Sequence, residues 1–215
     1  MRRGALRAPT LPVRCFDLWP QGARSAPLRR KRPSVTGGAA GSAVARPAAF
    51  LLIALAAVLS ACGPDWREYR SEAGKYSVEF PGGRPAERET QGRAAIVHLA
   101  HVEIDRTTAY GVSWFDVAKP AKPVAELLTD MQAEVLRDLK ATARQASEIE
   151  LPGPGGDAPG RAFTARTETG IDVSIRLYAA GADPVRVYQV IAAVPDAARA
   201  EGDIKRFFDS FKLLK

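Results

Sequence analysis

The two histidines of the chain, His98 and His101, stand in the spacing His-x-x-His. On a helix this spacing would place both imidazoles on one face, where they could bind one metal ion. The residues around them alternate between apolar and polar, which predicts a strand, and residues three apart on a strand point to opposite faces. We therefore expect no metal site. His98 is predicted to pack in the core, and His101 to face solvent or a covering helix.

Other reactive side chains lack the neighbours that catalysis requires. Ser113 lies in the run Gly111–Phe115, which lacks the second glycine of a nucleophile elbow. Glu103 and Asp105 could act as paired carboxylates on one strand face, and a solvated strand end is the simpler interpretation. No Lys-Ser or Lys-Thr pair follows the Gly- and Pro-rich run Pro152–Gly160, as it would in a phosphate-binding loop. We therefore expect no enzyme activity, no catalytic residue and no cofactor.

Two further sets of residues could bind a ligand. The first consists of aromatic residues on one predicted strand: Tyr110, Trp114 and Phe115. Because aromatic residues on strands are usually part of the core, we expect these to be buried. The second consists of arginines on three consecutive late strands: Arg161, Arg176 and Arg186. They could form a row that binds an anion, although ion pairs with Glu168 or Asp172 would satisfy the same side chains.

An apolar segment, Ala48–Leu59, precedes Cys62. Its 12 residues are fewer than the roughly 20 that a helix needs to span a bilayer. The segment matches the apolar core of a secretory signal, because Arg46 precedes it and small residues follow it. The sequence therefore predicts export of the protein, and a buried apolar helix is the alternative interpretation.

The end of this segment, Leu59-Ser60-Ala61-Cys62, resembles the lipobox of bacterial lipoproteins. In that family the cysteine thiol carries diacylglycerol, the chain is cut before the cysteine, and the new amino group is usually acylated. The resemblance implies cleavage between Ala61 and Cys62 and lipidation of Cys62; a plain signal peptide with an unrelated cysteine is the alternative. Gly63 stands where an aspartate often retains lipoproteins at the inner membrane. The resemblance therefore implies the outer membrane, facing the periplasm.

Residues 1–43 form a basic leader of low complexity. Residues 1–61 together hold ten of the 31 basic residues and one of the 24 acidic residues of the chain. The rest of the chain has 21 basic and 23 acidic residues, a net charge near −2, so we expect no nucleic-acid partner. Translation could instead begin at Val44. Residues 1–43 would then not be made, and residues 44–61 would be a signal peptide of ordinary length.

Residues 62–65 would form a lipidated tether, and residues 66–215 a single domain. The chain has two cysteines, Cys15 in the leader and Cys62. Lipidation would therefore leave the domain no thiol for a disulfide, a nucleophile or a metal site. A domain of about 150 residues buries enough apolar surface to be stable without such links.

Hydrophobic periodicity predicts the elements of this domain. The predicted strands cover residues 69–70, 75–80, 93–105, 109–117, 147–151, 161–168, 171–180 and 185–194. An apolar stripe predicts a long helix from Val124 to about Ala143, and a final helical region begins at Pro195. Consecutive strands joined by short turns imply an antiparallel sheet. The predicted fold class is α+β, with about six to seven strands covered by the long helix and the C-terminal helix.

Five segments of the domain carry a resemblance to a known group: Gly74–Gly82, Tyr110–Ser113, Arg176–Tyr178, Val187–Val190 and Phe207–Phe211. They are similar to bacterial domains of the PsbP/Mog-like α/β/α sandwich group, and the layout is similar to that of DcrB-type envelope lipoproteins. Members of this fold group mainly bind or help to assemble other proteins. The resemblance implies a non-catalytic envelope lipoprotein that binds or supports another protein, and it assigns no partner-binding residue. The alternative is a periplasmic carrier that binds a small ligand or ion in a pocket between sheet and helix.

Overall fold

A computed structural model describes residues 64–92 and 95–215. Its elements, in chain order, are β1 (Trp66–Ser71), β2 (Tyr76–Pro81), β3 (Ala86–Gln91), β4 (Ile96–Glu103), β5 (Ala109–Val117), α2 (Val124–Asp138), β6 (Thr142–Leu151), β7 (Ala158–Arg166), β8 (Asp172–Ala180), β9 (Val185–Val194), α3 (Glu201–Ser210) and β10 (Lys212–Leu213). The predicted leader, the signal segment and the cleavage site at Ala61 and Cys62 lie outside the described residues.

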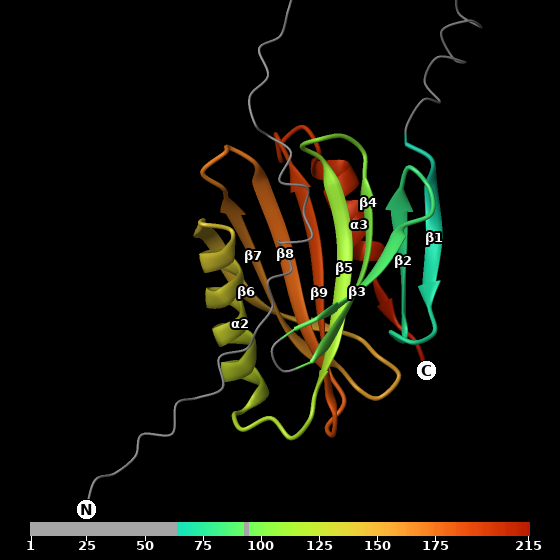
Figure 1. Cartoon of the computed structure of the whole chain (residues 1–215), viewed down its shortest axis with the longest axis vertical. Coiled ribbons are helices and arrows are strands. Elements are labelled where there is room, and N and C mark those ends of the chain that lie inside the picture. The colour runs from blue at the N-terminus through green and yellow to red at the C-terminus, as the bar shows by residue number, and fades with distance from the viewer. Residues whose placement is uncertain (1–63, 93–94) are drawn as a thin grey trace, which may run out of the picture. The chain divides into compact units, whose positions relative to one another are not determined.

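The described strands form two sheets. The larger has seven antiparallel strands in the order β3-β4-β5-β9-β8-β7-β6, and the smaller has three in the order β1-β2-β10. Figure 1 shows α2 and α3 on opposite sides of the seven-stranded sheet. The predicted α+β class, its antiparallel sheet and its two covering helices are confirmed. The separate three-stranded sheet is not expected from the sequence pattern.

The side of the large sheet that α2 covers, here called the α2 face, forms one hydrophobic core. The buried residues of α2 are Leu127, Leu128, Met131 and Val135. They recur at steps of one, three and four residues, as a single helix stripe requires. Together they pack on β7 and β8, where Ile175 and Leu177 are almost fully buried.

The opposite side, the α3 face, packs against α3 and the three-stranded sheet in a second and more aromatic core. Phe207 of α3 is 0% exposed, and its ring centroid lies 5.5 Å from that of Phe80 in β2 and 5.1 Å from that of Tyr110 in β5. Neighbouring strand residues alternate between the two cores, as Leu177 and Tyr178 do in β8. The central strands of the large sheet are therefore buried on both faces.

Helix α2 ends before the predicted Ala143 because Lys140 adopts a left-handed backbone conformation, with φ at 49°. The amide of Lys140 donates to the carbonyl of Arg137, and the amide of Ala141 donates to the carbonyl of Leu136. These two bonds form a Schellman motif, which closes a helix. Glycine usually occupies the left-handed position, so a lysine there gives no stop signal in the sequence.

The predicted strands are wrong at the two edges of the large sheet, β3 and β6, and at the starts of the strands beside them, β4 and β7. β3 has the sequence AERETQ, which has no apolar alternation and so gives no strand signal. The predicted strand over 93–105 begins only at Ile96, and the strand predicted over 147–151 begins already at Thr142. β7 likewise begins at Ala158, inside the predicted Gly- and Pro-rich loop. Exposed edge strands lose the period of two because neither of their faces must be apolar.

Helix α3 begins at Glu201 rather than in the predicted region from Pro195. A turn precedes it, in which the Asp196 carboxylate accepts hydrogen bonds from the backbone amides of Ala198 and Arg199 at 3.1 and 3.2 Å. This use of an aspartate is typical of a turn that leads into a helix. No helix within residues 64–92 and 95–215 has the length and apolar character needed to cross a membrane.

Candidate functional site

His98 and His101 lie on opposite faces of β4, as the strand spacing predicts, but His98 is only partly buried rather than a core residue, and His101 does not face solvent. The side chain of His98 is 28% exposed and lies beside Glu89, with Nδ1 3.1 Å from the Glu89 carboxylate. His101 is the more buried residue, with 8% of its surface exposed. Within the described residues no group of three or more His, Cys, Asp or Glu side chains is arranged to hold a metal ion.

His98 is part of a stack of three side chains. Its imidazole lies parallel to the Trp114 indole, with ring centroids 3.9 Å apart and an interplanar angle of 9°. The Arg186 guanidinium lies 4.2 Å from the Trp114 ring centroid. Asp116 fixes this guanidinium by accepting from Nε and Nη2 at 2.7 and 2.8 Å. The stack therefore uses the π surface of Trp114 for internal packing.

Burial sets the charge state of His101. Desolvation and the nearby Arg88 guanidinium lower the pKa of His101 below its ordinary value of 6.5, and the Glu103 carboxylate acts in the opposite direction. Although Glu103 lies 3.6 Å from Nε2, the loss of water around the imidazole has the larger effect. His101 is therefore a neutral core residue at pH 7 rather than a partner of Glu103.

The depressed pKa of His101 predicts a loss of stability in mild acid. The unfolded chain binds a proton at His101 more readily than the folded chain does. The contribution of His101 to the unfolding free energy is therefore fully present above the ordinary pKa and is lost as the pH falls below it. We expect a lower unfolding free energy at about pH 5.5 than at about pH 7.5, measured by urea titration. His101→Gln should remove most of this difference. A His101→Gln variant that keeps the full pH dependence of the wild-type chain would contradict this assignment.

The candidate carboxylate pair does not form. Glu103 lies beside His101, whereas Asp105 turns into the following loop. There its Oδ1 accepts from the backbone amides of Thr107 and Thr108 at 2.7 and 2.8 Å. Bonds from Thr107 lower the pKa of Asp105 because they favour the charged carboxylate. The predicted interpretation, a solvated strand end, is the correct one.

The predicted aromatic set is part of the core, as expected. Tyr110, Trp114 and Phe115 are 2%, 8% and 3% exposed. Phe115 faces the core of the α2 face, and the other two face the aromatic core. Burial raises the pKa of Tyr110 to about 12. These residues offer no exposed binding surface.

The three predicted arginines do not meet. Arg161 points to α2, where Nε donates to Gln132 at 2.8 Å. Arg186 belongs to the Trp114 stack, and Arg176 lies over the ring of Phe208 in α3, 4.7 Å from its centroid. The possible anion-binding row does not form, because cross-strand register places Arg161 and Arg176 on opposite faces of the sheet. The favoured ion pairs with Glu168 or Asp172 are wrong as well, since the acidic neighbours of the three arginines in the described residues are Glu148, Asp209 and Asp116.

Arg176 instead lies in a trough between α3 and the strands β6, β7 and β8, with a volume of about 430 Å³. Cross-strand register forms its floor from two rows of residues on the α3 face. These rows are Gln145–Thr164–Ser174 and Ser147–Ala162–Arg176. Ile204 and Phe208 of α3 form its apolar wall. The floor is thus mostly polar and has four small side chains, Ser147, Ala162, Thr164 and Ser174, next to an apolar side.

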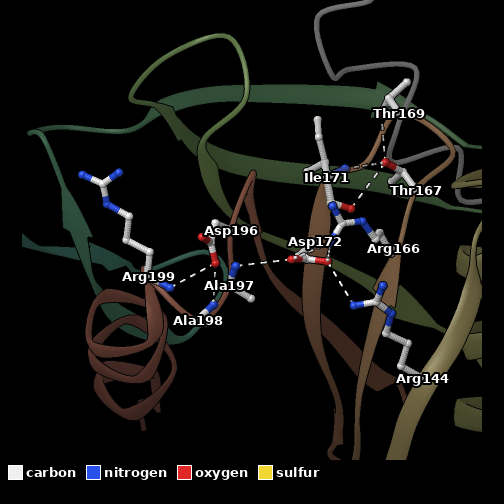
Figure 2. Close-up of polar contacts among 10 residues, drawn as sticks. All are labelled: Arg144, Arg166, Thr167, Thr169, Ile171, Asp172, Asp196, Ala197, Ala198 and Arg199. Carbon is white, nitrogen blue, oxygen red and sulfur yellow. Dashed lines mark hydrogen bonds and ion pairs between the residues drawn. The ribbon is translucent and has the colours of Figure 1, made fainter.

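Asp172 of β8 lies in the row next to this floor and links neighbouring parts of the sheet (Figure 2). Its carboxylate accepts from Arg144 of β6 at 3.3 Å, from Arg166 of β7 at 3.2 Å and from the backbone amide of Ala197 at 3.3 Å. The carboxylate is only 14% exposed. One side chain therefore ties the two outer strands to the connection that leads into α3.

The sequence pattern misses this trough because its residues come from three separate strands. Gln145, Ser147, Thr164 and Ser174 are ordinary polar strand residues when read singly. Only the pairing of Gln145 with Thr164, and of Thr164 with Ser174, makes them neighbours. One sequence signal could have indicated the trough: polar residues at every second position of 172–176, which make one face of β8 polar.

Comparisons with known proteins give similarities in structure rather than in sequence. No protein-family model matches the chain, and no curated protein matches it. The fold is similar to that of cyanobacterial PsbP. The match is to the solution structure of cyanobacterial PsbP (CyanoP) from Synechocystis sp. PCC 6803, with 12% sequence identity and a TM-score of 0.48, over 71% of this chain and 95% of that chain. A likeness at this identity concerns the fold alone and assigns no residue a role.

Proposed function

We propose that the chain is a non-catalytic, lipid-anchored protein of the cell envelope that binds an extended segment of another protein along β6. The anchor rests on the lipobox-like run that ends at Cys62 and on the apolar segment before it. With Gly63 after the cysteine, the proposed address is the outer membrane, facing the periplasm. The binding role rests on the free edge of the seven-stranded sheet.

The observation that carries the binding role is the position of β6 at one end of the sheet. Among the described strands β6 pairs only with β7, so its outer backbone groups face away from the sheet. A bulge interrupts the pairing between Ala143 and Gln145, but the register from Gln145 to Leu151 is regular. This regular part is about 24 Å long at 3.4 Å per residue. Such an edge is a template for an added strand.

The two edges of the sheet differ in where their charged residues stand, since β3 and β6 each contain one arginine and two glutamates and neither contains lysine or proline. In β3, the shorter strand at the opposite end, Glu87, Arg88 and Glu89 follow one another. In β6 the charged residues stand on either side of an uncharged run from Gln145 to Ser147. Arg144, before this run, bonds to Asp172 of the same sheet. Because charges normally protect edge strands, this uncharged run is the least protected part of the two edges.

A matched pair of substitutions tests this assignment. Ala146 in β6 and Ala86 in β3 are both exposed edge residues. Ala146→Lys should abolish partner binding, because a lysine opposes the addition of a strand, whereas Ala86→Lys should leave binding unchanged. Both variants should unfold within about 0.5 kcal/mol of the wild-type chain, since neither site is buried.

Binding is measured by photo-crosslinking in intact cells, with the photoreactive residue placed at Glu148 in β6 or at Arg88 in β3. We expect a discrete adduct from position 148 that disappears with Ala146→Lys and persists with Ala86→Lys. Adducts of equal yield from both edges, or an adduct that survives Ala146→Lys, would argue against the β6 edge as the binding surface.

A further inference from the structure

The trough on the α3 face has the size and lining of a small-molecule site. Its volume of about 430 Å³ falls within the roughly 300–1,000 Å³ that ligand pockets usually have. Among the eleven described residues that line it, Arg176 has the only charged side chain. A site with one positive charge, several hydrogen-bonding groups and one apolar wall fits an organic anion that has an apolar part.

Arg176 is held in place by groups that do not neutralise it fully. The Phe208 ring lies 4.7 Å below its guanidinium carbon, which fixes the plane of the guanidinium. The Asp209 carboxylate lies 3.9 Å from Nη1, beyond hydrogen-bond distance. The guanidinium, which is planar and has five N–H donors, can therefore bind the two oxygens of a carboxylate side by side.

The floor supplies the remaining polar contacts. Ser174 lies two residues before Arg176 on the same face of β8, and Thr164 lies opposite Ser174 in β7. Ser147 and Ala162 continue the row of Arg176 toward the edge of the sheet. The hydroxyl groups of Ser147, Thr164 and Ser174 can either donate or accept a hydrogen bond.

From this arrangement we propose that the trough binds a small organic anion, with its anionic group on Arg176 and its apolar part against Phe208 and Ile204. The trough is lined in part by Gln145, Ala146 and Ser147 of β6. Its proposed contacts to the anion come from Arg176 and α3 rather than from the outer backbone groups of β6, so the proposal goes beyond the proposed function and does not depend on it. A carboxylate and a phosphate monoester share the required chemistry. One positive charge favours a ligand of low charge.

The test uses the purified full chain and three probes that share a phenyl group: 3-phenylpropionate, its neutral analogue 3-phenylpropanamide, and phenyl phosphate. Binding is followed through the NMR amide shifts of Thr164 and Ser174 and by calorimetry. We expect a dissociation constant of about 1 mM or tighter for at least one of the two anions, and binding at least about tenfold weaker for the amide. The better of the two anions identifies the anionic group that the trough prefers.

Substitutions assign the binding to the trough. Arg176→Gln should weaken anion binding at least about tenfold and leave the weak binding of the amide unchanged. Arg161→Gln is the matched control, because Arg161 lies on the other face of the sheet and contacts α2. Arg176→Lys keeps the positive charge but loses the planar guanidinium, so it should bind the anion several-fold more weakly than the wild type does. This variant replaces Arg176→Gln in the test if Arg176→Gln does not fold.

Three outcomes would overturn the proposal. They are equal affinity for the anion and the amide, equal effects of the Arg161 and Arg176 substitutions, and the absence of any shift at Thr164 and Ser174 with either anion. None of these outcomes bears on the β6 edge, because crosslinking from Glu148 reports partner binding independently of Arg176.

Discussion

Cys62→Ser is expected to release the protein from the membrane. A serine hydroxyl cannot replace the thiol that would carry diacylglycerol, so the acyl chains would be absent. Each buried CH₂ group contributes about 0.8 kcal/mol, so one chain holds a protein only marginally and three hold it almost permanently. The apolar segment Ala48–Leu59 has 12 residues and cannot replace the anchor by spanning the bilayer, which takes roughly 20 residues.

Cell fractionation and intact mass measure this prediction. The native protein should begin at Cys62, carry the added acyl mass and sediment with membranes, and the serine variant should lack the acyl mass and appear in the soluble fraction. Cys15→Ser is the matched control, because Cys15 precedes the expected cleavage site and should change neither property. A native chain that begins elsewhere, or a Cys62→Ser chain that stays wholly in the membrane, would contradict the lipid anchor.

Phe207→Ala is expected to cost about 3–5 kcal/mol of unfolding free energy, which is typical for truncating a fully buried phenylalanine. The Phe207 ring is 0% exposed and lies between rings from both sheets, Phe80 of β2 and Tyr110 of β5. Its neighbour Phe208 also contacts it, with ring centroids 5.6 Å apart. Because rigid aromatic neighbours collapse poorly into a void, much of the lost volume should remain as a cavity.

Urea unfolding measures this change, with Lys205→Ala on the same helix as the control. Lys205 is exposed and pairs only with Asp209, one turn along α3, within the described residues. Its removal should change the unfolding free energy by no more than about 0.5 kcal/mol. A loss below about 1 kcal/mol for Phe207→Ala would show that α3 does not hold the two sheets together through this ring.

The sequence best predicts elements that have one buried and one exposed side, and strands that are buried on both sides. β5 and β9 have the predicted bounds, Ala109–Val117 and Val185–Val194. Their residues must fill both cores, so their composition is almost wholly apolar or aromatic. The polar edge strands β3 and β6 lack this constraint. The sequence pattern misses β3 entirely and predicts only the second half of β6.

Burial depth and site geometry could not be predicted for a different reason. Strand alternation correctly separates His98 from His101 by face, but it does not say how much protein covers each face. Similarly, Arg161 and Arg176 occupy neighbouring strands in the pattern, and only the register shows that they point apart. The lipobox-like run depends on adjacent residues alone, which is why the sequence predicts Cys62 without any knowledge of the fold.

The two edges of the large sheet bear on how far copies of this protein could polymerise through strand addition. A sheet with two unprotected edges can pair with a new copy at either end and grow into a fibre. Here two copies paired through their β6 edges would each present β3, with its three successive charges, at the outer end. We therefore expect growth to stop at a dimer, which would oppose aggregation at high local concentration.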